Sequence, residues 1–404
     1  MIIEEYEAKT LVRPSYPSLF AWMEYTLNPY QGCAHNCGYC DGKSERYRMH
    51  TDFGTKIRVK RNAPELLERF LINKGLRSVR MVQGSLFGPE RSQPEFTLFI
   101  GGGVCDVYQP VEVEKRLMRQ LLQLAYDYGV PVLILTKSEL VLEDLDLLKK
   151  VNQETHAGVS LTITLADKGI SKIFEPGASG PEERFHTIQQ LREAGINSGV
   201  YLMPILPFIG DTDANLDTIC SKAKASGAEF VHAWGLTLTP GRNKEEFFHT
   251  LEDYFPKMLP KYRLLYGNND RYGKFNPRIA TQFSVASPEL KAFRLIYESG
   301  LDYTAKRFIP AGRIRSNLRV SEVLMRAAYL KGTFLGTWQE AKRLIQGAIL
   351  LEKLEQDVFE LSREQLNRIG LPSETHPYLA ELFLGDCSKS LTELEKQVYQ
   401  RSLL

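Results

Sequence analysis

Three cysteines lie close together in the stretch NPYQGCAHNCGYCDGK, where Cys33, Cys37 and Cys40 are spaced C-x3-C-x2-C. A structural zinc site normally takes four protein ligands, so zinc would need a further donor from His35, Cys105 or elsewhere. A [4Fe–4S] cluster suits three thiolates, because each protein-bound iron takes one cysteine and the fourth iron stays open to another ligand. The spacing therefore indicates a metal centre, with an iron–sulfur cluster and zinc as the two alternatives.

The composition is that of an ordinary globular protein with room for two domains. The chain has 404 residues, of which 43% are hydrophobic and 25% charged. No run of about 18 apolar residues predicts a transmembrane helix, and acids stand at the N-terminus where a signal peptide carries Lys or Arg. Six cysteines at uneven positions do not resemble a disulfide framework. We therefore expect a cytoplasmic protein with reduced thiols and no membrane partner.

The elements that must position the cysteines alternate between strands and helices. Strand-like runs occupy 96–102, 130–138, 158–165, 197–207 and 229–238, and helical periodicity occupies 62–71, 111–129, 142–151, 181–195 and 213–227. With 23–30 as a first strand, this makes six βα units. The pattern predicts a parallel sheet flanked by helices, either open or curved into a partial barrel, with the active site at the carboxyl ends of the strands. The cysteines follow the first strand and fall at that end.

After about residue 305 the strand-like runs stop and helical patterns follow one another. We therefore expect two domains: 1–300, holding the parallel sheet and an N-terminal extension, and 301–404, which is all helical.

Two segments are rich in positive charge. Residues 43–61 hold seven Lys or Arg against two acids, and residues 304–319 hold five against none. Each segment is either a solvated stretch of surface or part of a surface that meets an anionic polymer.

The cysteine spacing, with Tyr39 just before the last cysteine and a βα unit around it, resembles the radical S-adenosylmethionine (SAM) superfamily. The resemblance implies a partial (β/α)6 TIM-type barrel and a [4Fe–4S] cluster on Cys33, Cys37 and Cys40. It also implies that SAM binds the open iron and is cleaved reductively to a 5′-deoxyadenosyl radical, with electrons from a donor such as flavodoxin or ferredoxin.

Further stretches resemble the spore-photoproduct-lyase-like, or "DNA repair photolyase", branch of that superfamily. They are IRVKRNAPELL, GGGVCDVYQPVE, VLILTKSELVLEDLDLL, ITLADKGISKIFEPGASGPEERF and GVYLMPILPFIGD, in the order expected for that branch over roughly residues 20–240. This branch implies lyase-like radical chemistry in DNA repair, with DNA or another nucleic acid as partner.

The resemblance also assigns residues to the cofactor. Gly102, Gly103 and Cys105, in the loop GGGVCD after the second strand, are placed beside SAM. Lys137 matches a position near the SAM carboxylate, and Thr162 matches a hydroxyl-bearing position that faces SAM.

Glu175 and Arg184 match an acid and a base that follow the fourth strand in this branch. For these two residues, a contact with SAM or substrate and an ion pair at the start of a helix are both open interpretations.

The sequence departs from true spore photoproduct lyases at two positions. Asp41 follows the third cysteine where a tyrosine is usual, and Gly103 occupies the position of the cysteine that donates hydrogen. The nearest thiol is Cys105, which is either a replacement donor or a buried thiol with no special role. We therefore do not expect a true spore photoproduct lyase.

The helical tail is similar in helix order to the helix-hairpin-helix domain of X-family DNA polymerases, although the turn GLPSETH retains only Gly370 of the expected glycines. A plain capping domain is the alternative. Three functions remain open: a radical SAM enzyme acting on a nucleic-acid base, a radical SAM enzyme acting on a small molecule or peptide, and a zinc-stapled nucleic-acid-binding protein without catalysis.

Overall fold

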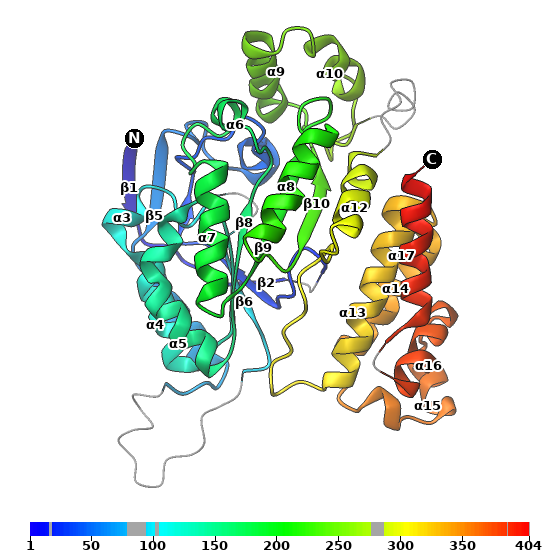
Figure 1. Cartoon of the computed structure of the whole chain (residues 1–404). Helices are drawn as coiled ribbons and strands as arrows, with labels where there is room; N and C mark the ends of the chain where they lie inside the picture. The colour runs from blue at the N-terminus through cyan, green and yellow to red at the C-terminus, as the bar shows by residue number, and fades with distance from the viewer. Residues whose placement is uncertain (16–17, 79–93, 102–104, 276–286, 386, 404) are drawn as a thin grey trace. The chain divides into compact units, whose positions relative to one another are not determined.

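A computed structural model describes residues 1–15, 18–78, 94–101, 105–275, 287–385 and 387–403 (Figure 1). The chain divides into two compact units: Met1–Tyr16 with Met23–Ala305, and Pro17–Trp22 with Lys306–Leu404. The sequence placed the boundary at residue 300 and did not indicate that a short N-terminal segment belongs with the helical unit. No helix in the described part of the chain is long and apolar enough to cross a bilayer.

The main sheet of the first unit has the strand order β10-β9-β8-β7-β6-β3-β2. Its strands are β2 (Arg13–Pro14), β3 (Tyr25–Leu27), β6 (Leu98–Gly101), β7 (Val132–Thr136), β8 (Ala157–Thr162), β9 (Asn197–Ile205) and β10 (Val231–Gly235). The six strands from β3 to β10 run parallel, each beside the next one along the chain, while β2 is antiparallel. The predicted α/β class with a parallel sheet is confirmed.

Helices follow the strands as expected, and Figure 1 shows α4, α5, α7 and α8 in front of the sheet. The helices of this unit include α1 (Ala63–Asn73), α3 (Glu112–Lys115), α4 (Leu117–Tyr128), α5 (Leu145–Glu154), α6 (Lys168–Phe174), α7 (Pro181–Glu193), α8 (Asp213–Ala225), α9 (Arg242–Tyr254), α10 (Leu259–Tyr266) and α12 (Pro288–Glu298). The single helix predicted over 111–129 is wrong. Arg116 has a left-handed φ of 51° that separates α3 from α4, and the Glu112 carboxylate accepts the Met118 N–H at 2.7 Å.

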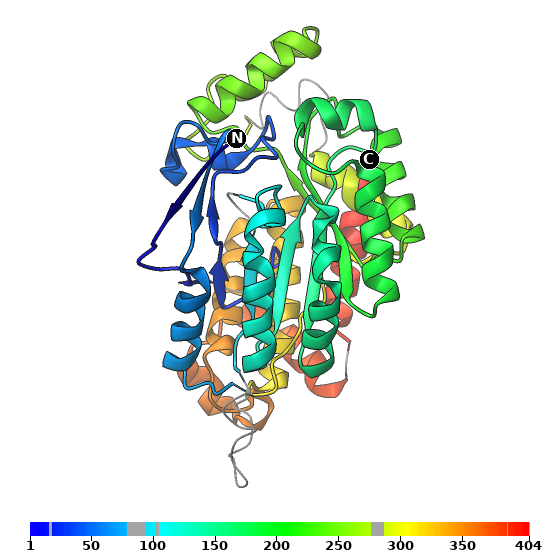
Figure 2. The same ribbon diagram turned by 90° about the vertical axis from the view of Figure 1, so that its left-hand side faces the viewer.

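The predicted first strand is divided between two sheets. Its first part is β3 of the main sheet, and its last residue begins β4 (Tyr30–Gln31) of a smaller sheet with the order β1-β5-β4. In this smaller sheet, β5 (Lys56–Lys60) pairs with β4 antiparallel and with β1 (Ile2–Tyr6) parallel. Figure 2 shows the dark blue N-terminal strand of this sheet beside the N label. The cysteines therefore lie in the connection between β4 and β5.

The second unit consists of helices and turns in its described residues after 305. Its main helices are α13 (Arg315–Tyr329), α14 (Trp338–Glu352), α15 (Arg363–Ile369), α16 (His376–Leu384) and α17 (Lys389–Ser402). Gly370 ends α15 in a left-handed conformation with φ of 74°, which is a common helix C-cap.

Inside the second unit, Glu352 gathers the basic residues that precede α13. It pairs with Arg307, accepts from Arg313 at 3.2 Å and accepts from Ser321 Oγ at 2.6 Å. Arg319 likewise pairs with Glu322 at 2.8 Å. Three of the five cations in 304–319 are thus engaged by carboxylates.

Candidate active site

The backbone of the cysteine loop is held from both sides. Gly32 has φ of +84°, and a Cβ atom there would lie 2.4 Å from the Lys56 carbonyl oxygen, so this position requires glycine. The Cys33 N–H donates to the Phe53 carbonyl at 2.9 Å, and the Gly38 N–H donates to the Phe174 carbonyl at 2.7 Å. The loop is therefore fixed between the segment leading into β5 and the end of α6.

Two buried amide side chains clamp the same loop. Gln109 donates to the Gly32 carbonyl at 3.0 Å and accepts the Ala34 N–H at 2.8 Å. Asn243, in the first turn of α9, donates to the Cys40 carbonyl at 2.9 Å. Both amides are 0% exposed. Neither was identified from the sequence, although Gln109 lies within the quoted stretch GGGVCDVYQPVE.

The three thiols of the loop are buried or partly buried, with Cys33 7% and Cys37 6% exposed. Burial raises the pKa of all three, and it raises the pKa of Cys37 to about 12. Neighbouring loop thiols add to the rise at Cys33, so the three groups lie close enough to interact. Thiols in this setting stay protonated until a metal replaces the proton.

The donor set fits an iron–sulfur cluster. Among the described residues, no three His, Cys, Asp or Glu side chains converge on a position for one metal ion. A cubane cluster does not need such convergence, because each cysteine binds a different iron. His35, the alternative zinc donor, is buried with Nδ1 3.4 Å from Oδ2 of Asp106, which is an ion-pair distance without hydrogen-bond geometry.

Asp106 ties this part of the site to the end of β7. Its carboxylate accepts from Thr136 Oγ1 and from the Lys137 N–H, each at 2.7 Å. Burial alone would raise the pKa of Asp106, but the charge of His35 and these hydrogen bonds together hold it well below its usual range. Asp106 is therefore an ionised, fully engaged carboxylate beside the loop. It was not singled out from the sequence.

Tyr39 lies at the centre of a buried polar network. Its hydroxyl donates to the Glu175 carboxylate and lies 3.4 Å from Thr164 Oγ1. Burial raises the pKa of Tyr39 well above its usual value, and the Glu175 charge adds to that rise. The phenol therefore stays neutral and acts as a donor that fixes the ring's orientation.

Glu175 and Arg184 form an ion pair in which each side chain is 1% exposed. Arg184 also donates to the Thr162 carbonyl at 2.7 Å and to the Ser179 carbonyl at 2.8 Å. Burial would raise the pKa of Glu175, but Arg184 and Lys137 outweigh it and lower that pKa. The pair lies at the start of α7, as one of the two interpretations expected, and it also contacts Tyr39.

Lys137, at the end of β7, lies beside the loop. Its Nζ is 5.9 Å from the centroid of the Tyr39 ring. Burial would lower the pKa of Lys137, but the Glu175 carboxylate and the Cys37 sulfur in its ionised form outweigh burial and raise it. The lysine is partly exposed, so it can balance negative charge on the loop and still reach a bound anion.

Thr162 ends β8 and is buried. Register pairs it with Tyr201 of β9, which pairs in turn with His232 of β10, so the three side chains share one face of the sheet. Thr162 contacts the network around Tyr39 through its carbonyl, which accepts from Arg184. The role of its hydroxyl toward SAM stays a prediction.

Cys105 lies next to the loop. Its Sγ donates to the Tyr30 carbonyl at 3.1 Å, and its own carbonyl accepts from Asn28 at 2.8 Å. It packs in one buried cluster with Cys33, against which Cys40 also packs. Burial raises the pKa of Cys105, so the group is an S–H. Gly102 and Gly103, predicted beside SAM, lie outside the described residues.

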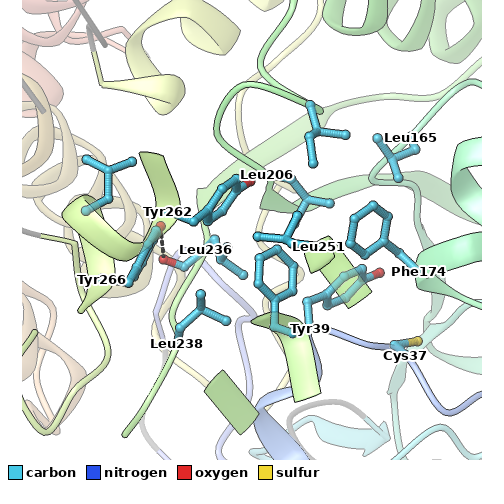
Figure 3. Packing of buried hydrophobic residues seen from close by; sticks show 13 residues of the cluster. Cys37, Tyr39, Leu165, Phe174, Leu206, Leu236, Leu238, Leu251, Tyr262 and Tyr266 are labelled. Carbon is cyan, nitrogen blue, oxygen red and sulfur yellow. Dashed lines mark hydrogen bonds between the residues drawn. The ribbon is translucent and has the colours of Figure 1, made fainter. Parts of the chain in front are cut away.

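A large apolar cluster packs against the side of the loop that carries Cys37 and Tyr39. Cys37 and Tyr39 pack in it with residues of α6, α9 and α10, among them Phe174, Leu251 and Tyr262, as Figure 3 shows. In this cluster the Tyr266 hydroxyl donates to the Leu236 carbonyl at 3.2 Å. Thus α9 and α10, which were not predicted, cover the side of the loop that carries Tyr39.

Comparisons with known proteins agree with this arrangement. The model of the radical SAM superfamily matches residues 27–223. An uncharacterised protein of Mycobacterium tuberculosis is 28% identical over 246 residues, which are 60% of this chain and 67% of that protein. An uncharacterised protein of Methanocaldococcus jannaschii is also 28% identical over 246 residues, which cover 61% and 82% of the two chains.

A solved structure of a spore photoproduct lyase mutant matches with a TM-score of 0.50 at 16% identity. The match covers 73% of this chain and 79% of that chain. At this level of identity the likeness concerns the fold.

Proposed function

We propose that this chain, whose residues 27–223 match the model of the radical SAM superfamily, is a radical SAM enzyme in which Cys33, Cys37 and Cys40 hold a [4Fe–4S] cluster with one iron open to SAM. When bound and reduced by a flavodoxin- or ferredoxin-type donor, the two cofactors supply a 5′-deoxyadenosyl radical that abstracts hydrogen from a substrate. The observation that carries the proposal is the triplet of buried or partly buried thiols on a loop clamped at both ends.

The surrounding residues have distinct roles in this proposal. Lys137 supplies positive charge beside Cys37 and toward a bound carboxylate. Glu175 and Arg184 hold the Tyr39 ring in one orientation, because its hydroxyl is bonded to their ion pair. Gln109 and Asn243 keep the loop rigid, so that binding a cofactor does not have to order it.

For the substrate we favour a nucleic-acid base, in lyase-like chemistry of the DNA repair type. A protein of similar fold is named spore photoproduct lyase, and that name supports lyase chemistry on a photoproduct as the class of reaction. A base in a duplex would have to be extruded to reach a site at the strand ends.

A small molecule or peptide is the second candidate, and a specific observation favours it. Much of the positive charge in 43–61 is neutralised, since Lys56 and Arg58 pair with Glu4, and Arg61 pairs with Glu7. These cations are therefore less available to phosphates than the sequence suggests.

Anaerobic reconstitution with iron and sulfide tests the cofactor. We expect a brown protein with about four irons per chain that releases 5′-deoxyadenosine from SAM after reduction. Cys33→Ala, Cys37→Ala and Cys40→Ala should each abolish both properties. Cys387→Ala, at an exposed cysteine of the second unit, is the matched control and should retain them. A colourless protein with one zinc and no iron would contradict the proposal.

The substrate class is tested separately on the reconstituted protein. We expect duplex or ultraviolet-damaged DNA to change the rate of 5′-deoxyadenosine release. An unchanged rate with every nucleic acid, together with normal SAM cleavage, would favour the small-molecule or peptide alternative.

A further inference from the structure

Exposed arginines and tyrosines gather close to the cysteine loop within the first unit. The Arg46 guanidinium carbon lies 5.4 Å from the centroid of the Tyr272 ring, and that of Arg271 lies 4.8 Å from the same centroid. Arg271 also donates to the Tyr272 hydroxyl at 2.7 Å. With the exposed neighbours Tyr47 and Arg48, these residues form what we call the arginine–tyrosine rim.

The rim is built on fixed backbone. On one side, Asp41 accepts from Thr237 Oγ1 at 2.9 Å. On the other, Asn269 donates to the Leu238 carbonyl at 2.6 Å, and the Leu238 N–H donates to the Gly273 carbonyl at 2.8 Å. The segment that begins at Asp41 and the segment 269–273 are therefore both anchored to the residues that follow β10. These residues lie at the carboxyl end of the sheet, where active sites of such folds lie.

The cations of the rim differ from the rest of the basic segment. Arg46 and Arg271 are exposed and held over an aromatic ring. The nearby acids Glu45 and Asp270 each accept from a backbone N–H. A guanidinium held over a ring keeps its N–H edges available for a phosphate.

The tyrosines of the rim add a second kind of contact. Tyr47 is 40% exposed and Tyr272 is 45% exposed. Exposed aromatic rings beside cations are the combination that binds single-stranded nucleic acid, because bases stack on the rings while the cations contact the backbone. An acidic protein would contact only the arginines of the rim, and the rings of Tyr47 and Tyr272 would have no role in binding it.

We infer that the arginine–tyrosine rim binds the phosphodiester backbone and bases of a single-stranded or locally opened nucleic acid and brings one base toward the cysteine loop. This inference rests on the proposed function and specifies where its nucleic-acid substrate is held. Arg46, Tyr47 and Arg48 of the rim follow Cys40 by six to eight residues of chain, so a strand bound at the rim lies near the loop.

The test uses the reconstituted protein and a short fluorescein-labelled oligothymidylate, with binding followed by fluorescence anisotropy over a series of salt concentrations. Arg46→Gln combined with Arg271→Gln should weaken binding about tenfold and make the slope of log K against log salt less negative by about 1.4, or about 0.7 for each lost phosphate contact. Tyr272→Leu should weaken binding about fivefold or more, whereas Tyr272→Phe should keep most of it.

Arg263→Gln, which removes an exposed cation of α10 outside the rim, is the matched control and should leave binding and its salt slope unchanged. Iron content and the visible absorption of each variant report whether the loop is intact. If the double variant loses iron, the single variant Arg271→Gln is measured instead. It should change the salt slope by half as much, about 0.7.

Three outcomes would overturn the inference. They are wild-type protein that does not bind the oligonucleotide, rim variants that bind like the wild type, and an acidic polypeptide of equal charge that binds as tightly with the same response to Tyr272→Leu. Normal 5′-deoxyadenosine release in any of these cases leaves the radical SAM proposal standing. Absence of iron and of SAM cleavage in the wild type refutes that proposal, whatever the rim binds.

Discussion

Each unit of the molecule contains a buried arginine paired with a glutamate, but the two pairs have different surroundings. Arg184 and Glu175 contact Tyr39 and lie beside the thiols. Arg307 and Glu352 contact Arg313, Ser321 and the helices of the second unit. In the first unit, the Arg184–Glu175 pair therefore fixes the Tyr39 ring beside the thiols. In the second unit, the Arg307–Glu352 pair joins the segment before α13 to α13 and α14. Burial alone does not distinguish these roles, whereas the neighbouring groups do.

The largest effect is expected from Arg184→Ala. It leaves the Glu175 carboxylate buried without its cation, which should cost about 3 to 5 kcal/mol in the free energy of unfolding. Because the Tyr39 ring loses its fixed orientation, 5′-deoxyadenosine release should also fall about 100-fold or more. Chemical denaturation measures the loss in the free energy of unfolding, and the rate of 5′-deoxyadenosine release from SAM measures the loss of activity. Normal activity in a destabilised variant would show that this pair, like the other, is structural.

Acid should next destabilise the first unit selectively. Burial lowers the pKa of His232 and of His156 from 6.5 to about 4. Unfolded chains bind protons on these rings below pH 6.5 while the native rings stay neutral, so the contribution of the two rings to stability should fall as pH decreases from 6.5 to 4 and level off below that. The loss is up to roughly 3 kcal/mol for the fully buried His232 and less for His156, which is partly exposed.

Hydrogen exchange followed by mass spectrometry locates this effect. Amides of β8 to β10 should exchange faster at pH 5 than at pH 7 after correction for the intrinsic rate. Faster exchange confined to α13 and α14 would contradict the assignment to the two histidines.

Arg307→Ala should have a smaller effect than Arg184→Ala, because Glu352 keeps Arg313 and Ser321 as partners. We expect a loss of about 2 kcal/mol in the stability of the second unit. Hydrogen exchange in α13 and α14 measures it. Iron content and SAM cleavage should stay at the wild-type level, and a loss of either would mean that this pair also acts on the site.

Tyr39→Phe should give the smallest effect of this series. The ring stays in its apolar cluster, but the Glu175 carboxylate loses one donor while keeping Arg184. We expect a loss of about 1 kcal/mol in stability. The binding of SAM, followed by equilibrium dialysis, should weaken only a few-fold. Tyr39→Leu is the contrasting variant and should weaken it more, because it removes the ring.

The parallel strands could be predicted because each is a short apolar run between turns, and such runs carry their own signal. The smaller sheet was missed because its strands carry charges and were interpreted as acidic or basic segments. Strand β1, IIEEY, has two adjacent acids, whereas β5, KIRVK, alternates apolar residues with cations. The alternation itself was a usable signal for a strand with one buried face.

The cysteines could be found from spacing alone, whereas the residues that hold them could not. Asn243 lies 203 positions from Cys40, and Gln109 lies 77 positions from Gly32. An isolated Asn or Gln has no local pattern that reveals such a partner. The pairing of Arg307 with Glu352, 45 positions away, likewise depends on tertiary contacts and changes how a basic segment is interpreted.

The contact between Asn243 and the Cys40 carbonyl also constrains the order of events during synthesis. The three cysteines are synthesised before Asn243, so their loop gains this restraint only after some two hundred further residues have been made and α9 has docked. Until then the thiols are presented by an incompletely fixed segment. If the loop holds the proposed cluster, its site is therefore expected to be complete only after α9 has been made.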